Sequence, residues 1–234
     1  MHIVILTGAG MSADSGVDTF RDPNGAWAKH DWREVATPEG FAKDPQKVHD
    51  FYNMRRATLK KVIPNAAHHA LATLEKALGE NGHDFTLITQ NVDDLHRRAG
   101  SQSILPMHGQ LDLITCMACG EIIEWHDPVT LDTNCPHCSS KGSLRPYIVW
   151  FGENPRYMAE IDEAMQSATQ FVSIGTSGTV YPAAGLVGEA THRGIPTLEI
   201  NLEPSENAHL FDQGIYGLAK DKVPFWVDTL MATL

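Results

Sequence analysis

Short runs of apolar residues recur along the chain, and a glycine or a polar side chain follows each run. Apolar runs without polar alternation are typical of parallel strands that are buried on both faces. The pattern therefore predicts five strands, at residues 3–6, 85–89, 104–107, 171–174 and 197–200.

Helical patterns separate these strands. Asp44 and Pro45 are suited to cap and begin one helix, because the aspartate accepts hydrogen bonds from the first turn and proline lacks the N–H that would be left over there. The alternation of strands and helices predicts an α/β fold, with a Rossmann-like parallel sheet and helices on both faces. Further helices are expected at residues 65–81, with Gly79 and Gly82 ending it, from Pro182 to Gly194, and at residues 223–231.

A glycine loop follows the first strand. Gly8 and Gly10 let the backbone turn tightly and approach a ligand closely, and Ser12 beyond them is suited to opening a helix whose free N–H groups attract phosphate. The loop favours the pyrophosphate of a dinucleotide, although a glycine pair alone also fits an ordinary tight turn. Residues 19–27 continue it with polar and aromatic side chains, in a loop more elaborate than a plain helix start.

Glycines or polar residues also follow the other expected strands. Ligands of open α/β sheets bind beyond the carboxyl ends of the strands, so these segments should line one nucleotide crevice, with His108 among them. An ordinary hydride-transferring dehydrogenase is disfavoured, because the acidic ribose contact expected about 20 residues after the glycines falls inside the elaborate loop. The five segments are residues 7–10, 89–93, 107–109, 175–178 and 201–203.

All four cysteines fall into two C-x-x-C pairs, with fifteen residues between the pairs. Each pair can supply two thiolates to one tetrahedral zinc ion, and the spacing is that of a zinc ribbon. Four sulfur ligands make a closed structural site, which leaves no open position for catalysis. Disulfides or a redox dithiol are the alternatives. The predicted ligands are Cys116, Cys119, Cys135 and Cys138.

Tyr52 and Arg55 lie three residues apart on the inward face of the helix that begins at Pro45. Their spacing fits an arginine that extends to solvent beside a core tyrosine. It fits equally well a two-point clamp for a carboxylate, because a guanidinium fork matches two carboxylate oxygens.

The composition narrows the possible partners. The chain has 234 residues and a formal net charge of −11, and no basic patch indicates contact with nucleic acid. The length suits one large core with a small inserted module. No apolar run approaches the roughly 18 residues of a membrane span, and residues 1–6 read as a strand and not as a signal peptide. We therefore expect a cytoplasmic protein without a direct membrane or nucleic-acid partner.

Taken together, these motifs resemble the sirtuins, the NAD-dependent protein deacylases. GAGMSADSG with TFR, TQNVDDLH, MHG, the paired C-x-x-C segments, RPYIVWFGE, GTS with VYPAA, and NLE occur in the family's order over nearly the whole chain. Tyr52 and Arg55 resemble the class III branch, which removes negatively charged acyl groups such as succinyl from lysine. Ala36 also fits this branch, which has a small residue there and so leaves room for a longer acyl chain.

The resemblance implies roles for individual residues. The acyl carbonyl oxygen would attack the ribose of NAD and expel nicotinamide, after which His108 would act as general base, with Asn91 and Asp93 as further catalytic residues. Acylated lysine in proteins would be the substrate, with Tyr52, Arg55, Ala36, Val149 and Phe151 binding it. NAD would contact Gly8, Ala9, Gly10, Ser12, Phe20, Arg21, Trp27, Gln90, Asn91, Asp93, Gly175, Thr176, Ser177, Asn201, Glu203 and Ala219.

The same resemblance implies a division of the chain. A Rossmann-like NAD-binding domain would comprise residues 1–27, 68–112 and 145–234, and a small domain would combine a helical module at 28–67 with a zinc-binding module at 113–144. The expected products are free lysine, nicotinamide and O-acyl-ADP-ribose. Alternatives are a deacetylase that makes little use of the clamp, an ADP-ribosyl transferase, or a non-catalytic NAD-sensing module. Tyr147 and Gly178 depart from the residues that many sirtuins carry.

Overall fold

The computed structural model describes residues 1–19, 22 and 25–234. Within these residues the larger of two sheets has six parallel strands, in the order β3-β2-β1-β7-β8-β9. The predicted fold class and all five predicted strands are confirmed, and the edge strand β9 is an addition. The strands are β1 (His2–Thr7), β2 (Asp84–Thr89), β3 (Ile104–Pro106), β7 (Gln170–Ile174), β8 (Thr197–Asn201) and β9 (Gln213–Tyr216).

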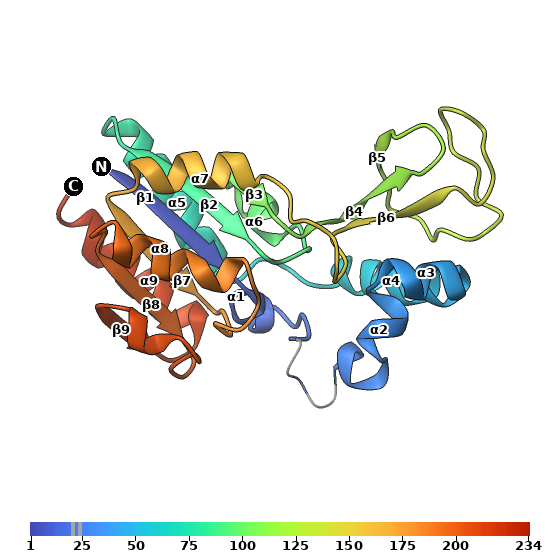
Figure 1. Ribbon diagram of the computed structural model, residues 1–234. Coiled ribbons are helices and arrows are strands. Elements are labelled where there is room, and N and C mark those ends of the chain that lie inside the picture. The colour runs from blue at the N-terminus through green and yellow to red at the C-terminus, as the bar shows by residue number, and fades with distance from the viewer. Residues whose placement is uncertain (20–21, 23–24) are drawn as a thin grey trace.

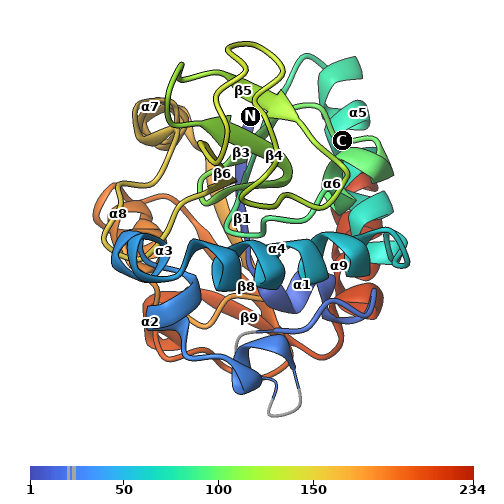
Figure 2. The same cartoon turned by 90° about the vertical axis from the view of Figure 1, so that its right-hand side faces the viewer.

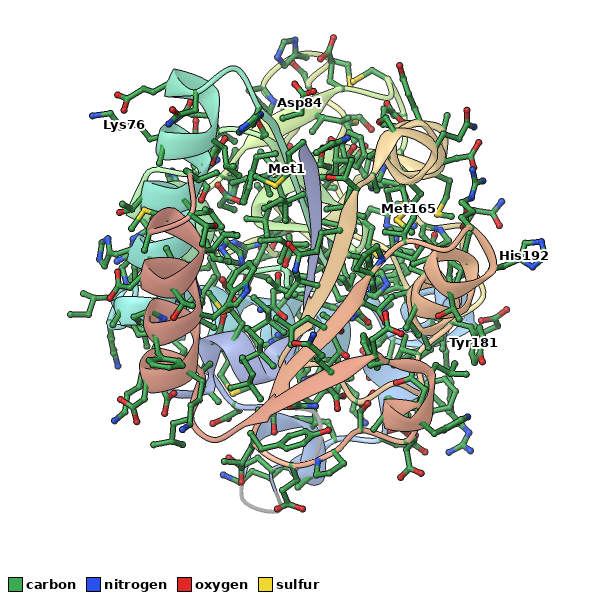
Figure 3. All side chains as sticks on the ribbon, turned by 90° about the vertical axis from the view of Figure 1, so that its left-hand side faces the viewer. Met1, Lys76, Asp84, Met165, Tyr181 and His192 are labelled. Carbon is green, nitrogen blue, oxygen red and sulfur yellow. The ribbon has the colours of Figure 1, made fainter. Side chains whose placement is uncertain are left out.

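Helices cover both faces of this sheet (Figure 1, Figure 3). The helices α5 (Ala66–Glu80) and α9 (Ala219–Met231) lie on one face. The helices α7 (Met158–Ser167) and α8 (Leu186–His192) lie on the other. Each helix presents an apolar stripe to the strands, as a sheet that is buried on both sides requires.

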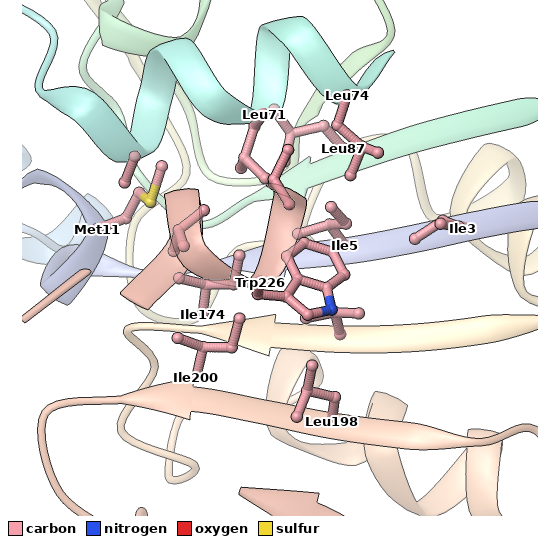
Figure 4. Packing of buried hydrophobic residues seen from close by; sticks show 14 of the residues in the cluster. Ile3, Ile5, Met11, Leu71, Leu74, Leu87, Ile174, Leu198, Ile200 and Trp226 are labelled. Carbon is pink, nitrogen blue, oxygen red and sulfur yellow. The ribbon is translucent and has the colours of Figure 1, made fainter. Parts of the chain in front are cut away.

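The side chains of β1 alternate between these two layers. Ile3 and Ile5 pack toward α5 and α9, whereas Val4 and Leu6 pack toward α7 and α8. Figure 4 shows the first layer, in which Trp226 of α9 packs with the strand residues Ile5, Ile174 and Leu198. The centre of the sheet is therefore a rigid platform, and the loops at its strand ends are held by it.

Several helix boundaries differ from the sequence prediction. The first helix, α1 (Ala9–Ala13), begins directly after Gly8, so Ser12 lies within it and does not open it. The last helix begins at Ala219, four residues before the predicted start. Its first turn contains polar residues that read as a loop, and Asp14 accepts a hydrogen bond from the Lys220 N–H there.

Two further boundaries also differ from the prediction. The segment after Pro182 forms a short 3-10 turn, η2 (Ala183–Gly185), before α8 begins. Gly79 lies inside α5, which ends at Glu80, and it is Gly82, at a φ of +70°, that turns the chain away. Other short elements are η1 (Ala26–Lys29), α6 (Leu95–Ala99) and η3 (Ala208–Leu210).

A second part of the molecule lies beyond the carboxyl ends of the sheet strands (Figure 1). It combines three helices with an antiparallel sheet in the order β5-β4-β6, and α4 runs alongside β4 and β6 (Figure 2). The sequence did not predict this sheet, and the predicted domain boundaries stay a prediction. The elements are α2 (Trp32–Val35), α3 (Pro38–Lys43), α4 (Pro45–Leu59), β4 (Gly109–Cys116), β5 (Ile122–Glu124) and β6 (Leu144–Ile148).

The predicted start of α4 is confirmed, since the Asp44 side chain accepts a hydrogen bond of 3.0 Å from the Lys47 N–H and Pro45 is the first helical residue. None of the helices in the described part of the chain is long and apolar enough to cross a bilayer.

Candidate active site

Two glycine loops meet at the carboxyl ends of β1 and β7. The Gly8 N–H donates to the Ile174 carbonyl and the Gly10 N–H to the Gly175 carbonyl, each at 2.9 Å. A Cβ atom on Gly8 would lie 2.8 Å from the Gly175 oxygen, and Gly175 itself has a φ of +65°. Only glycine allows this close approach without strain, and it leaves the backbone of both loops open to a ligand.

Asn91, which follows β2, is tied to the same loop. Its Nδ2 donates to the Gly8 carbonyl at 3.0 Å and to the Ser12 hydroxyl at 3.1 Å. Because both bonds use the amide nitrogen, Oδ1 is the atom left to face a ligand. Asp93 accepts hydrogen bonds from Ser12 and from the Leu95 N–H, while burial raises the pKa of its carboxyl. The structure therefore brings predicted residues from two strand ends together.

A buried histidine pair lies behind these residues, and the sequence did not single it out. Thr7 Oγ1 is 3.0 Å from Nε2 of His96, whose ring packs against His68 at 4.8 Å between centroids. His68 Nε2 in turn lies 3.4 Å from the Ser12 hydroxyl. Burial lowers the pKa of both histidines, that of His68 to about 4, so both are neutral near pH 7. A histidine at an apolar helical position was the available signal.

His108 lies at the next strand end. Its Nδ1 is 3.1 Å from the Gln90 carbonyl, and the Gln90 N–H donates to the Thr7 carbonyl at 2.9 Å. A carbonyl only accepts, so this contact places the proton on Nδ1 and leaves Nε2 with its lone pair. Burial lowers the pKa of His108, which keeps the imidazole neutral near pH 7. His108 thus combines the position and the protonation state of a general base.

The remaining predicted nucleotide contacts follow β7 and β8 or begin α9. Asn201 Nδ2 donates to the Thr176 carbonyl at 2.7 Å, which joins the two strand ends, and Ser177 contacts Thr179 at 2.8 Å. Glu203 is exposed, and Ala219 is the buried first residue of α9. Phe20 and Arg21 lie outside the described residues. The roles predicted for all these residues toward NAD stay predictions.

A cavity of about 130 Å³ lies between the crevice and α4. Asp93 lines it from the crevice side, and Trp27 and Arg55 line it from the other. The Arg55 guanidinium carbon is 5.0 Å from the centroid of the Trp27 ring, a cation–π contact. Burial lowers the pKa of Arg55, while the charges of Asp93 and other acidic groups act in the opposite direction.

Tyr52 is 1% exposed and does not line this cavity. Its hydroxyl accepts a hydrogen bond of 3.0 Å from the indole Nε1 of Trp150, and burial raises the pKa of the phenol to about 12. Trp150 was not among the predicted site residues. It lies between Val149 and Phe151, both predicted to bind substrate, and it is buried whereas Phe151 is exposed.

The other predicted substrate residues surround the same region. Ala36 is buried at the end of α2, and its carbonyl accepts a hydrogen bond of 3.0 Å from the Phe151 N–H. The Val149 N–H donates to the His108 carbonyl at 2.9 Å, whereas the Phe151 ring is 42% exposed and packs against Trp32. The segment after β6 thus connects His108 to the residues predicted to bind the substrate.

The four cysteines converge at the far end of the small sheet. Their sulfur atoms all lie within 4.8 Å of one another, with Cys116 to Cys138 at 3.7 Å and Cys119 to Cys135 at 3.8 Å. Four sulfurs bound at about 2.3 Å to a tetrahedral zinc ion would lie about 3.8 Å apart, whereas a disulfide requires about 2 Å. The donor set therefore fits a structural zinc ion, and it does not form disulfides.

Comparison with known sequences agrees with this geometry. The profile of the Sir2 family matches residues 8–182. An NAD-dependent protein deacylase of Caulobacter vibrioides is 53% identical over 236 residues, which cover 100% of this chain and 98% of that protein. An NAD-dependent protein deacylase of Salmonella typhimurium is 49% identical over 235 residues, which cover 100% of this chain and 85% of that protein.

Solved structures extend the likeness to the whole fold. A Sir2 homologue in complex with NAD has a TM-score of 0.89 at 36% identity, over 99% of this chain and 90% of the other. A Sir2 protein with a deacetylated p53 peptide and 3'-O-acetyl ADP ribose has a TM-score of 0.81 at 29% identity, over 99% of this chain and 92% of the other. With a family profile over most of its length and relatives near 50% identity over all of it, the chain belongs to the Sir2 family, the sirtuins.

Proposed function

We propose that the chain is an NAD-dependent protein-lysine deacylase, which releases nicotinamide and O-acyl-ADP-ribose as it frees the lysine. The observation that supports this most strongly is His108, a neutral imidazole with Nε2 free, joined through Gln90 to the loop of Gly8. The same chemistry is favoured by the relatives of the chain that are named NAD-dependent protein deacylases, and by the structural neighbour solved with a deacetylated peptide.

The residues of the crevice divide the chemical tasks. NAD supplies the ribose carbon that accepts the acyl oxygen when nicotinamide leaves. Asn91 is held by Gly8 and Ser12, so its Oδ1 can orient a hydroxyl or an amide of the bound nucleotide. His108 Nε2 can take the proton of a ribose hydroxyl, because the Gln90 carbonyl fixes the proton on Nδ1. Burial keeps water away from these groups and strengthens their interactions.

Within this activity, the acyl chain that the site favours ends in a carboxylate, as in succinyl or malonyl. Arg55 lines the cavity beside the crevice, and none of the described carboxylates forms an ion pair with it. A charged acyl end would supply the missing partner, and a guanidinium binds carboxylates with two parallel hydrogen bonds. An acetyl group would leave the charge of Arg55 without such a partner.

Turnover of two matched peptides tests the activity. One peptide carries acetyl-lysine and the other succinyl-lysine, and nicotinamide and deacylated peptide are both measured with and without NAD. We expect one nicotinamide for each lysine freed, with the succinyl peptide the better substrate. Absence of nicotinamide release with either peptide would favour the NAD-sensing module instead.

The variant Arg55→Met tests the acyl preference. Loss of a charge-paired contact of at least about 2 kcal/mol should lower kcat/KM for the succinyl peptide by roughly 30-fold or more. For the acetyl peptide, kcat/KM should fall less or should rise. Lys29→Met is the matched control, because Lys29 lines the same cavity but is exposed, so its removal should change the preference little. Equal loss on both peptides in Arg55→Met would contradict the clamp.

A further inference from the structure

We infer that Trp150 is a positioning residue for acyl selectivity, which holds the Tyr52 hydroxyl so that its proton is donated toward the carboxylate bound by Arg55. This inference rests on the proposed preference for acidic acyl groups, and it adds a residue that acts through Tyr52 without touching the substrate.

The hydrogen bond between Trp150 and Tyr52 has a fixed direction. The indole N–H of Trp150 is a donor only, and it lies 3.0 Å from the Tyr52 hydroxyl oxygen. The phenol is therefore the acceptor in this contact, and its own O–H must point elsewhere. Tyr52 is 1% exposed and Trp150 is 2% exposed, so bulk water does not compete for either group.

The Tyr52 proton stays in place over the working pH range. Burial raises the pKa of the phenol to about 12, so the hydroxyl keeps its proton near neutrality. Arg55, one helical turn along α4, acts electrostatically on the same phenol. Tyr52 does not itself line the cavity, so its link to the Arg55 fork is this interaction between neighbouring α4 residues. A carboxylate held by that fork is the acceptor we assign to the O–H, since an acetyl group ends in a methyl that accepts nothing.

Trp150 is itself held by a second set of contacts. The Arg145 guanidinium carbon lies 3.6 Å from the centroid of its ring, and Arg145 binds both carboxylate oxygens of Glu153, at 2.7 and 3.0 Å. The Trp150 backbone N–H also donates to Glu153, at 2.9 Å. The indole cannot rotate without breaking this arrangement, so the donor to Tyr52 is preorganised.

A linked chain of this kind polarises its members. A phenol that accepts a hydrogen bond donates a stronger one, and low local dielectric increases the effect. The stacked guanidinium on the Trp150 ring also makes the indole N–H a better donor. Removal of the N–H should therefore weaken succinyl binding more than acetyl binding.

The experiment is a double-mutant cycle on the ratio of kcat/KM for the succinyl peptide to that for the acetyl peptide. It compares the natural chain with Trp150→Phe, Tyr52→Phe and the double variant. We expect each single variant to lower the ratio by roughly tenfold, the effect of one hydrogen bond to a charged group. The double variant should lower it no further than Tyr52→Phe alone, because Trp150 acts through the phenol.

A looser core could also result from Trp150→Phe. Trp150→3-benzothienylalanine keeps the shape of the indole and replaces only the N–H, so it should lower the ratio as much while the melting temperature stays near that of the natural chain. An equal loss of kcat/KM on both peptides in the Trp150 variants would overturn the inference. So would a Trp150 substitution that lowers the ratio as much in the Tyr52→Phe background as in the natural chain.

Failure of the proposed function gives a different pattern. If Arg55→Met and Tyr52→Phe both leave the ratio unchanged, the acyl preference itself is wrong, and the role of Trp150 falls with it. If those two variants change the ratio and both Trp150 variants do not, only the role of Trp150 is overturned.

Discussion

At the scale of single residues, the crevice depends on positions where no side chain fits. Gly175 has a φ of +65°, and a Cβ atom there would lie 2.4 Å from the Met11 nitrogen. The loops after β1 and β7 can approach each other only because that space is empty. The sequence indicated these glycines as a ligand loop, but the contact between the two loops joins segments that are far apart in the chain.

Gly175→Ala should therefore destabilise the protein by about 2 kcal/mol or more, since alanine adds both backbone strain and a steric clash. Gly79→Ala is the matched control. Gly79 lies within α5 with no atom within 4 Å of its Cβ position, so alanine there should stabilise by about 0.5 to 1 kcal/mol. Urea unfolding of both variants measures the two effects, and an unchanged stability in Gly175→Ala would contradict the packing of the loops.

The buried histidine pair predicts a pH dependence of stability. Burial lowers the folded-state pKa of His68 to about 4 and that of His96 well below its usual value. In the unfolded chain these two histidines take up protons near pH 6.5, whereas in the folded chain they do so only at far lower pH. The free energy of unfolding should thus fall as the pH drops from about 6.5 toward 4, by up to about 1.4 kcal/mol per unit for each histidine.

Unfolding measured between pH 5 and 7.5 tests this dependence, because most carboxyl groups remain ionised over that range. His96→Gln should flatten the dependence, since it removes one of the two groups. His192→Gln should keep it, because His192 is exposed on α8 (Figure 3). A slope in His96→Gln equal to that of the natural chain would show that His96 does not contribute.

At the scale of elements, α4 connects the cavity lined by Arg55 to the part of the chain that carries the four cysteines. Asn53 donates to the Val129 carbonyl at 2.7 Å and accepts from the Val129 N–H at 2.9 Å, so one side chain satisfies both backbone groups of a buried residue. The neighbouring Arg56 donates to the Leu111 carbonyl of β4 at 3.0 Å. Tyr52 and Arg55 project from the same helix, so these contacts fix their position.

Asn53→Ala should lower the free energy of unfolding by about 1 to 3 kcal/mol, because it leaves two buried backbone groups without partners. Gln46→Ala on the same helix is the control, since the hydrogen bond from Gln46 to Asp50 is exposed, and its loss should cost less than about 0.5 kcal/mol. Equal stability of the two variants in urea would mean that Asn53 does not anchor α4.

Local signals predicted some elements and failed for others. Asp44 and Pro45 fix the start of α4 through contacts within one turn, and the sequence showed them directly. The pairing of β4 with β6 joins strands on either side of the zinc-binding loop, so no local pattern reveals it. The hydrogen bond from Trp150 to Tyr52 spans 98 residues and was missed for the same reason.

At the scale of the whole molecule, the site forms where the large sheet meets the smaller part of the chain (Figure 1). The crevice comes from loops at strand ends, and the cavity lined by Arg55 comes from α4 and its neighbours. The convergence of strand ends was predictable, because parallel strands present their carboxyl ends at one edge. The placement of α4 over that edge was not, since it depends on packing between distant segments.

Removal of zinc should unfold the small sheet, because metal binding at such sites is coupled to folding. Activity on the acetyl and succinyl peptides should then fall together. The helices that cover the larger sheet should keep their circular dichroism signal. Circular dichroism and turnover after chelation measure both effects. Zinc should restore activity and magnesium should not, because thiolates do not suit magnesium. Full activity after complete metal removal, with the fold intact, would contradict the structural role.

Replacement of His108 by alanine tests most directly whether the nucleotide, the base and the acylated lysine share one crevice. The reaction should lose roughly 10²- to 10⁴-fold in kcat, the usual contribution of a general base. NAD binding, followed by calorimetry, should change by less than about threefold, since the glycine loops and Asn91 remain. Deacylation by His108→Ala at the rate of the natural chain would contradict the proposed active site.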